Sequence, residues 1–243
     1  MPNVNYLLAE VFVSPSNSTI LPPFSSKVGK TLLGGRHNVS VSPLRRGHDY
    51  LVKYSAFPHY LEVEAGELLS FEVGGSEGDV ISALSQLEER EVFNTRWEVV
   101  DVKIRPVEFN CRSFSVIIKT PALIPDPFRK DRRKRFTNLF AFTFALNIMD
   151  HLGINREEYR GIMLEIEEKV REEPSKLGYV TVIYAGKEVV GLVGTLRYTV
   201  FEHDQRIRGA LENAIAKGIG SSRRNGFGRV EVVCNGLQVP GLR

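Results

Sequence analysis

Apolar residues recur along the first half of the chain at two spacings, one typical of strands and one typical of helices. Alternating stretches predict strands at residues 6–13, 39–44, 50–56, 61–64, 68–73 and 97–107. Phe24, Val28 and Leu32 share one helical face and predict a short helix before the Gly34-Gly35 pair. A second amphipathic helix is expected from Ser76 through Arg90. Residues 1–108 therefore predict the order β-α-β-β-α-β with an extra strand in the middle.

The second half of the chain repeats this order. Strands are expected at 114–119, 179–185, 189–200 and 229–234, the middle two as a hairpin turning at Gly186 and Lys187, and helices at 136–152, 155–172 and 204–217. Asn155 is expected to cap the second of these helices. The fold class predicted from this repeat is α+β, with two tandem ferredoxin-like (βαββαβ) domains at residues 1–108 and 109–243.

Composition indicates an ordinary globular protein, with 42% hydrophobic and 25% charged residues among 243. Cys111 and Cys234 could pair once, but we expect both to be small buried apolar residues of a cytoplasmic protein. The chain shows no signal-peptide pattern and no apolar run long enough to span a bilayer, so no membrane partner is expected. The net charge of +3 is too small to indicate nucleic-acid binding, and the argument depends on where the basic residues gather.

The most distinctive stretch is a glycine-rich loop at residues 217–229, KGIGSSRRNGFGR. Glycines allow the backbone N–H groups to approach an anion, and two adjacent arginines can bind phosphate through forked donors. A nucleotide-binding P-loop opens a helix, whereas this loop follows a predicted helix and precedes a strand. ATP binding is therefore disfavoured, and an extended phosphate backbone fits better. The alternative is a surface turn with solvated arginines.

Basic residues gather at two other places. One is the run at residues 129–135, next to a proline-rich loop, and the other comprises Arg36, Arg45 and Arg46. Either is a candidate nucleic-acid contact, and the alternative for the run is a solvated linker.

His37 is the leading candidate for proton transfer, since it lies in a loop just after the first predicted helix, beside Arg36. A histidine with a near-neutral pKa can accept a proton from a ribose 2′-hydroxyl or donate one to a 5′-oxygen. His48 is the second candidate, and the alternative for both is a surface residue without a role. No His, Asp or Glu cluster has metal-ligand spacing, so neither a metal nor another cofactor is expected.

The segment GIGSSRRNGFGRV at residues 218–230 resembles the glycine-rich motif of the RAMP superfamily, in particular its CRISPR repeat-processing endoribonucleases. Five further segments agree with this family in order: LPPF at 21–24, SVSPL at 40–44, VEAGELLSF at 63–71, KTP at 119–121 and GLVGTLRY at 191–198. The resemblance implies two ferredoxin-like domains whose shared cleft binds CRISPR repeat RNA. It also implies metal-independent cleavage within each repeat to give guide RNAs, leaving a 2′,3′-cyclic phosphate and a 5′-hydroxyl.

The resemblance also suggests roles for particular residues. His37, or alternatively His48, would be the catalytic histidine, with Lys30 and Arg36 steadying the scissile phosphate. The remaining candidates are RNA-binding residues: Lys217, Gly218, Gly220, Ser221, Ser222, Arg223, Arg224, Gly226, Gly228, Arg45, Arg46, Arg132, Arg133 and Arg135. A homodimer and membership of a CRISPR effector complex are both compatible with this family.

Two other functions fit the same sequence. One is a non-catalytic RNA-binding RAMP subunit of an effector complex, which would share the glycine-rich loop. The other, disfavoured by the order of helix and loop, is a small-molecule or nucleotide enzyme on the same fold.

Overall fold

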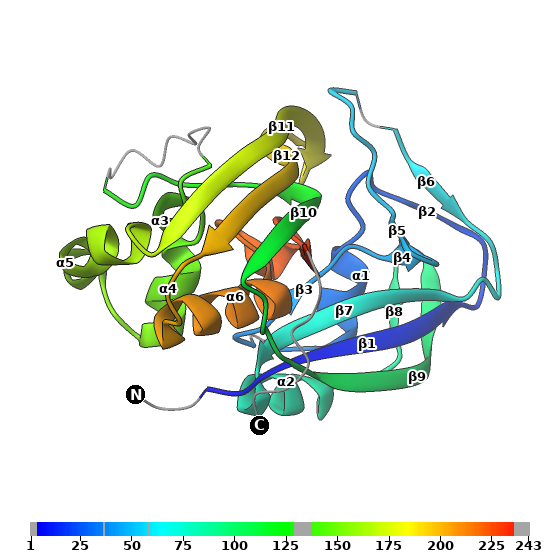
Figure 1. Cartoon of the computed structure of the whole chain (residues 1–243). Helices are drawn as coiled ribbons and strands as arrows, with labels where there is room; N and C mark the ends of the chain where they lie inside the picture. The colour runs from blue at the N-terminus through cyan, green and yellow to red at the C-terminus, as the bar shows by residue number, and fades with distance from the viewer. Residues whose placement is uncertain (1–3, 36, 58, 129–137, 236–243) are drawn as a thin grey trace.

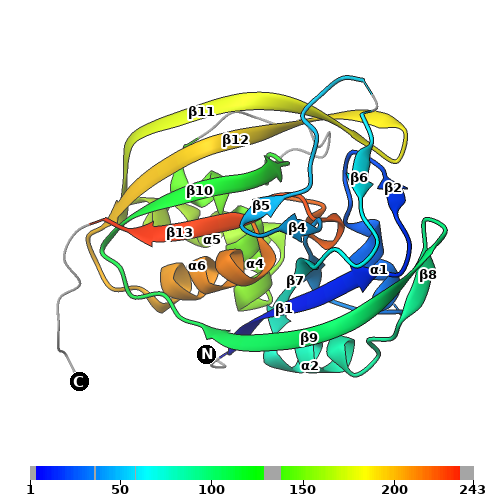
Figure 2. The same cartoon turned by 90° about the vertical axis from the view of Figure 1, so that its right-hand side faces the viewer.

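The computed structural model describes residues 4–35, 37–57, 59–128 and 138–235. Two sheets stand side by side, each with helices packed against one of its faces (Figures 1 and 2). This arrangement confirms the predicted α+β class with two ferredoxin-like units. No helix in the described ranges is long and apolar enough to cross a membrane.

The first sheet is built around strand β1 (Tyr6–Pro15), which pairs antiparallel with β7 (Leu69–Ser76) on one side and β9 (Thr95–Val107) on the other. The strand order is β5-β4-β7-β1-β9-β8, and β3 also pairs with β7. The short strands are β3 (Ser40–Val41), β4 (Arg45–Arg46), β5 (Asp49–Tyr50) and β8 (Arg90–Val92), and a separate ribbon joins β2 (Thr19–Leu21) to β6 (Leu61–Val63).

The helices α1 (Lys27–Leu32) and α2 (Glu77–Leu84) cover this first sheet. The core between them contains Val11, Phe71 and Trp97, all fully buried. The alternation of apolar residues in the sequence gives each strand the inward face that this core requires.

The second sheet has the order β11-β12-β10-β13, from β10 (Ser113–Ala122), β11 (Val170–Tyr184), β12 (Lys187–Val200) and β13 (Val230–Cys234). In the first sheet β1 lies between β7 and β9, and in the second sheet β10 lies between β12 and β13. The first long strand of each half is therefore central, and the predicted repeat of element order is present. The helices of this half are α3 (Phe140–Thr143), α4 (Ala145–Leu152), α5 (Arg156–Glu167) and α6 (Gln205–Lys217). Asn155 caps α5 through a capping box, as predicted.

Several predicted elements are wrong in length. The helix expected to run to Arg90 ends at Leu84, because the N–H of Glu88 donates to the carbonyl of Leu32 at 3.0 Å and the chain then enters β8. The apolar helix expected at 136–152 is divided at Phe144, where φ is −100° and ψ is 10°. The helix expected to reach Glu172 ends at Glu167, since β11 begins three residues later.

Two strand predictions and the cysteine prediction also need correction. The strand at 39–44 is reduced to Ser40–Val41, and the stretch at 50–56 contributes only Asp49–Tyr50 and an isolated bridge from Val52 to Phe24. Cys111 and Cys234 are not separate buried thiols, because they form a disulfide with their Cα atoms 5.5 Å apart. Antiparallel pairing of β10 with β13 brings them together.

The two halves meet through a close backbone contact. A Cβ added to Gly74 in β7 would lie 1.7 Å from the carbonyl oxygen of Ala216 in α6, so only glycine allows this approach. Tyr6, Leu8 and Val107 of the first half form a small apolar cluster with Ala216. The end of α6, from which the glycine-rich loop departs, is thereby pressed against the first sheet.

Candidate nucleic-acid interface

The glycine-rich loop makes a tight path between α6 and β13. Its backbone has positive φ at Gly218, Gly220, Ser222, Gly226 and Gly228, and a 3₁₀ turn, η1 (Arg223–Asn225), lies at its tip. Strand β10 and the residues after it hold the loop from one side: Gly228 N–H donates to Pro121 O, and Ser221 N–H donates to Leu123 O. The glycine spacing therefore produces a fixed loop with a turn that faces the first half of the chain.

The tip of this loop docks on the segment that begins at α1. Ser26 Oγ donates to the carbonyl of Asn225 at 2.8 Å, and Lys30 Nζ donates to Asn225 Oδ1 at 2.7 Å. Arg224 Nη2 donates to Oδ1 of Asn38 at 2.8 Å. Residues almost 200 positions apart in the sequence thus form one composite surface.

His37 lies at the edge of this surface, next to Asn38, and is half-buried. Its Nε2 lies 3.1 Å from the carbonyl oxygen of Leu33, the residue directly after α1. Because a carbonyl oxygen only accepts hydrogen bonds, this contact assigns the proton of the neutral ring to Nε2. Nδ1 is then the nitrogen that can accept a further proton.

The charges on the two sides of the docked loop differ. Lys30 and Arg224 are exposed residues that contact neutral amide oxygens. Partial desolvation of the Lys30 ammonium group lowers its pKa. Lys217 and Arg223 instead contact the carboxylate of Asp150, at 3.0 and 3.4 Å. Burial alone would raise the pKa of Asp150, but Arg223 and Lys217 beside it hold the pKa below its ordinary value.

Arg229 at the exit of the loop is buried and forms an ion pair between the two halves. Its Nη2 lies 2.8 Å from Glu72 Oε2, and its Nη1 donates to Ala216 O and to Ser40 Oγ. The residue is 1% exposed. Burial would raise the pKa of Glu72, but the positive charge of Arg229 keeps it below the ordinary value. Arg229 therefore fixes the loop against the first sheet.

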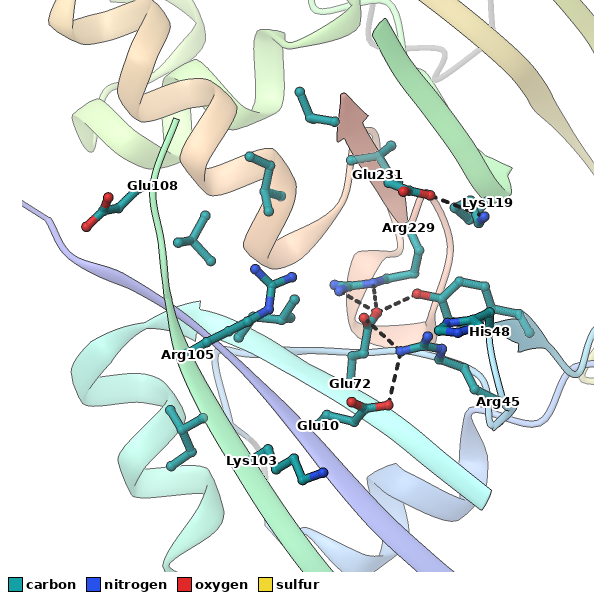
Figure 3. A pocket seen from close by; sticks show the side chains of 17 residues that line it. Glu10, Arg45, His48, Glu72, Lys103, Arg105, Glu108, Lys119, Arg229 and Glu231 are labelled. Atoms are coloured by element: carbon teal, nitrogen blue, oxygen red, sulfur yellow. Dashed lines mark hydrogen bonds and ion pairs between the residues drawn. The ribbon is translucent and has the colours of Figure 1, made fainter. Parts of the chain in front are cut away.

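A cleft of about 710 Å³ opens beside this ion pair and is lined by residues of both sheets and of α6 (Figure 3). Its basic lining residues are Arg45, His48, Lys103, Arg105, Lys119 and Arg229, and its acidic lining residues are Glu10, Glu72, Glu108 and Glu231. Arg45 pairs with Glu10 and Glu72, and Lys119 pairs with Glu231. The cleft is thus lined by mixed charge with an excess of basic groups.

The structure places the predicted site residues in different surroundings. Lys30, His37 and Arg224 lie on the composite surface, whereas Gly218, Gly220, Gly226 and Gly228 are buried and shape the loop. Arg45 and His48 lie in the cleft, while Arg46, which forms β4 with Arg45, makes an exposed ion pair with Glu67. Arg36, Arg132, Arg133 and Arg135 lie outside the described residues. Within the part of the chain that is described, no group of three or more His, Cys, Asp or Glu could hold a metal ion.

Sequence reasoning missed the polar partners that organise this region, namely Ser26, Asn38, Glu72, Asp150 and Asn225. Asn225 was within the recognised loop, and Asn38 directly follows His37, so both could have been suspected. Glu72 and Asp150 carry no local signal, because each acts through contacts far along the chain.

The chain thus consists of two ferredoxin-like units joined through a docked glycine-rich loop, which is the architecture that the sequence motifs predict. More particularly, residues 7–107 match the family described as the Cas6 N-terminal domain. The predicted resemblance to CRISPR repeat-processing RAMP proteins is therefore confirmed.

Solved structures with the same fold cover nearly the whole chain. Thermus thermophilus Cas6 is 12% identical, with 96% of this chain and 100% of that chain covered and a TM-score of 0.60. A Cas6-related protein of Pyrococcus furiosus is 15% identical, with 94% and 98% covered and a TM-score of 0.60. A protein described as a RAMP protein binding different RNA substrates is 14% identical, with 93% and 99% covered and a TM-score of 0.57. A comparison with curated proteins finds no match.

Proposed function

We propose that this protein binds CRISPR repeat RNA and cleaves it within each repeat without a metal ion, leaving a 2′,3′-cyclic phosphate and a 5′-hydroxyl. One observation carries the proposal: Arg224 of the glycine-rich loop is hydrogen-bonded to Asn38, the residue that follows His37. A group suited to phosphate and a group suited to proton transfer thus belong to one surface.

The chemistry needs a proton acceptor for the attacking 2′-hydroxyl, a proton donor for the departing 5′-oxygen and positive charge at the phosphate. His37 is proposed as the acceptor through Nδ1, given the contact of Nε2 with Leu33. Lys30 and Arg224 are proposed to supply the positive charge, and Arg36 is a further candidate. The lowered pKa of Lys30 makes it easier to deprotonate, so it is also a candidate for proton transfer.

RNA as the partner is supported by the relatives. Solved structures with this fold are named as a Cas6 product complex, a Cas6 substrate-mimic complex and a RAMP protein binding different RNA substrates. The basic side chains of the cleft extend the region where an RNA backbone would find positive charge. A homodimer or an effector complex is compatible with this proposal but is not required by it.

A second function has one observation in its favour. The contact between His37 and Leu33 O is of the kind that a histidine with a purely structural role makes. The chain would then be an RNA-binding subunit that does not cleave.

The decisive experiment incubates the purified protein with the CRISPR repeat RNA of its own genome in EDTA. The proposal predicts one cut per repeat, a 3′ product end that resists ligation until the cyclic phosphate is opened and the phosphate removed, and a 5′ end that a kinase can label. Tight binding without any cut would support the second function, and neither binding nor cleavage would refute both.

A further inference from the structure

The connection from β5 to β6 carries an unusual concentration of exposed aromatic rings. Within it, Tyr54 is 51% exposed, Phe57 is 73% exposed and Tyr60 is 63% exposed. We call residues 51–57, 59 and 60 the aromatic arm. Lys53 and His59 of the arm are also exposed, so the rings are separated by polar and basic side chains.

The base of the arm is anchored. Val52 forms a bridge with Phe24 and packs on a buried cluster that includes Val182 of β11, against which Tyr184 and Val189 of the β11–β12 hairpin also pack. Lys53 N–H donates to the carbonyl of Pro23 at 2.9 Å. The arm therefore projects from a fixed base, and in Figures 1 and 2 it rises beyond the first sheet beside the β11–β12 hairpin.

The arm stands at the rim of the cleft between the two sheets. The hydroxyl of Tyr54 donates to the backbone carbonyl of Lys119 at 3.2 Å, and Lys119 is one of the residues that line the cleft. His48, in the turn between β4 and β5, lines the same cleft. A strand whose phosphates follow the cleft would reach the arm at this rim.

We propose that Phe57 and Tyr60, assisted by Tyr54, stack on unpaired bases of an RNA strand whose phosphates occupy the cleft. The inference rests on the proposed RNA-binding function and assigns it a subsite. Aromatic side chains bind single-stranded RNA in this way because every base has a flat face, and basic groups nearby hold the backbone. Lys53, an exposed residue of the arm itself, provides such charge next to the rings.

A single-stranded RNA fits the arm better than a protein partner does. Protein interfaces centre on contiguous apolar area that is depleted of charge. The arm instead presents single rings interrupted by Lys53 and His59. Stacking uses rings one at a time and tolerates the polar residues between them.

The test measures equilibrium binding of the full chain to oligoadenylate and to oligouridylate of equal length, at several salt concentrations. Adenine stacks more strongly than uracil, so the wild-type protein should prefer oligoadenylate. The double change Phe57→Ala, Tyr60→Ala should weaken oligoadenylate binding roughly 5- to 50-fold and remove the preference. The salt slope should stay the same, because no phosphate contact is lost.

Two variants serve as controls. Phe57→Tyr keeps a ring and should bind as the wild type does, and Leu164→Ala removes a side chain of 68% exposure on α5, far from the arm. Thermal unfolding of each variant checks that the fold is retained.

The outcomes separate this inference from the proposed function. If the double variant binds oligoadenylate within twofold of the wild type while repeat RNA is still cleaved, the stacking subsite is wrong and the proposed function stands. If the wild type binds no RNA, both are wrong. If the double change alters self-association in sedimentation but not RNA binding, the arm is a protein-docking surface and the inference is overturned.

Discussion

Two sets of basic side chains meet at the glycine-rich loop, and they differ in what holds them. Arg223 and Arg229 face the carboxylates of Asp150 and Glu72. Lys30 and Arg224 face the amide oxygens of Asn225 and Asn38, which carry no net charge. A carboxylate compensates a cation, whereas an amide positions it and leaves its charge available for a phosphate. Arginines of one motif can therefore serve different purposes. Arg223 and Arg229 fix the loop, whereas Arg224 keeps a charge that is available to a ligand.

The largest effect on stability should come from Arg229, the buried member of the pair that faces carboxylates. Arg229→Ala leaves Glu72 buried without its main partner, so we expect the free energy of unfolding to fall by about 3–5 kcal/mol. Denaturant unfolding monitored by circular dichroism measures this loss. The matched control is Arg46→Ala, which breaks the exposed pair with Glu67 and should cost less than about 1 kcal/mol. Equal losses for the two variants would contradict the distinction between buried and exposed cations.

A carboxyl group whose pKa is raised, rather than lowered, extends the comparison to Glu167. Glu167 accepts a hydrogen bond from Ala141 N–H. Burial first, and then the neighbouring carboxyl group of Glu172, raises the pKa of Glu167 to about 8. The folded state thus holds a proton that the unfolded chain releases near pH 4.5. The resulting stabilisation is complete below pH 4.5 and is lost as the pH rises through 8.

Replacing the Glu167 carboxyl group by an amide should remove the contribution of this residue to the pH dependence of the unfolding free energy. Glu167→Gln and the wild type should have similar unfolding free energies at pH 5, and the variant should be more stable by roughly 1–2 kcal/mol at pH 9, a value reduced for partial exposure. Denaturant unfolding across this pH range is the measurement. A constant difference between the two proteins would show that Glu167 does not titrate in this window.

The smallest effect concerns the cations that amides hold. Arg224→Ala should weaken binding of repeat RNA several-fold and reduce the slope of log affinity against log salt by about one, because one phosphate contact is lost. Arg223→Ala should lower the thermal stability and leave that slope nearly unchanged, since Asp150 already compensates its charge. Filter binding at several salt concentrations compares them. If Arg223→Ala changes the slope more than Arg224→Ala does, the assignment of the phosphate contact to Arg224 and of the structural role to Arg223 is wrong.

Much of the fold could be predicted because it depends on local periodicity. Alternation in β1 and β9, the Asn155 cap and the helix that ends at Lys217 are all encoded within a few residues. The errors arise where distant contacts decide. The hydrogen bond from Glu88 to Leu32 accompanies the early end of α2, and pairing with β12 converts the end of a predicted helix into β11.

The sequence indicates candidate residue types for the site, but it does not indicate which of them contact one another. The glycine spacing and the adjacent arginines marked the loop, and His37 was noticed from its position after a helix. The sequence gives no sign that Asp150 and Glu72 would take up Arg223 and Arg229, because those carboxylates reach the loop only through the packing of α4 and β7 against it. Nor does it indicate that Asn38 and Asn225 join the loop to α1.

The central claim, that the composite surface cleaves RNA through His37, is tested most directly by His37→Ala. Single-turnover cleavage of repeat RNA at saturating protein should slow by about 10²–10⁴-fold, because a general acid or base contributes that much. The affinity for uncleaved RNA should stay within about threefold of the wild type, since Arg224 and the cleft are unchanged. A variant that cleaves as fast as the wild type would contradict the account.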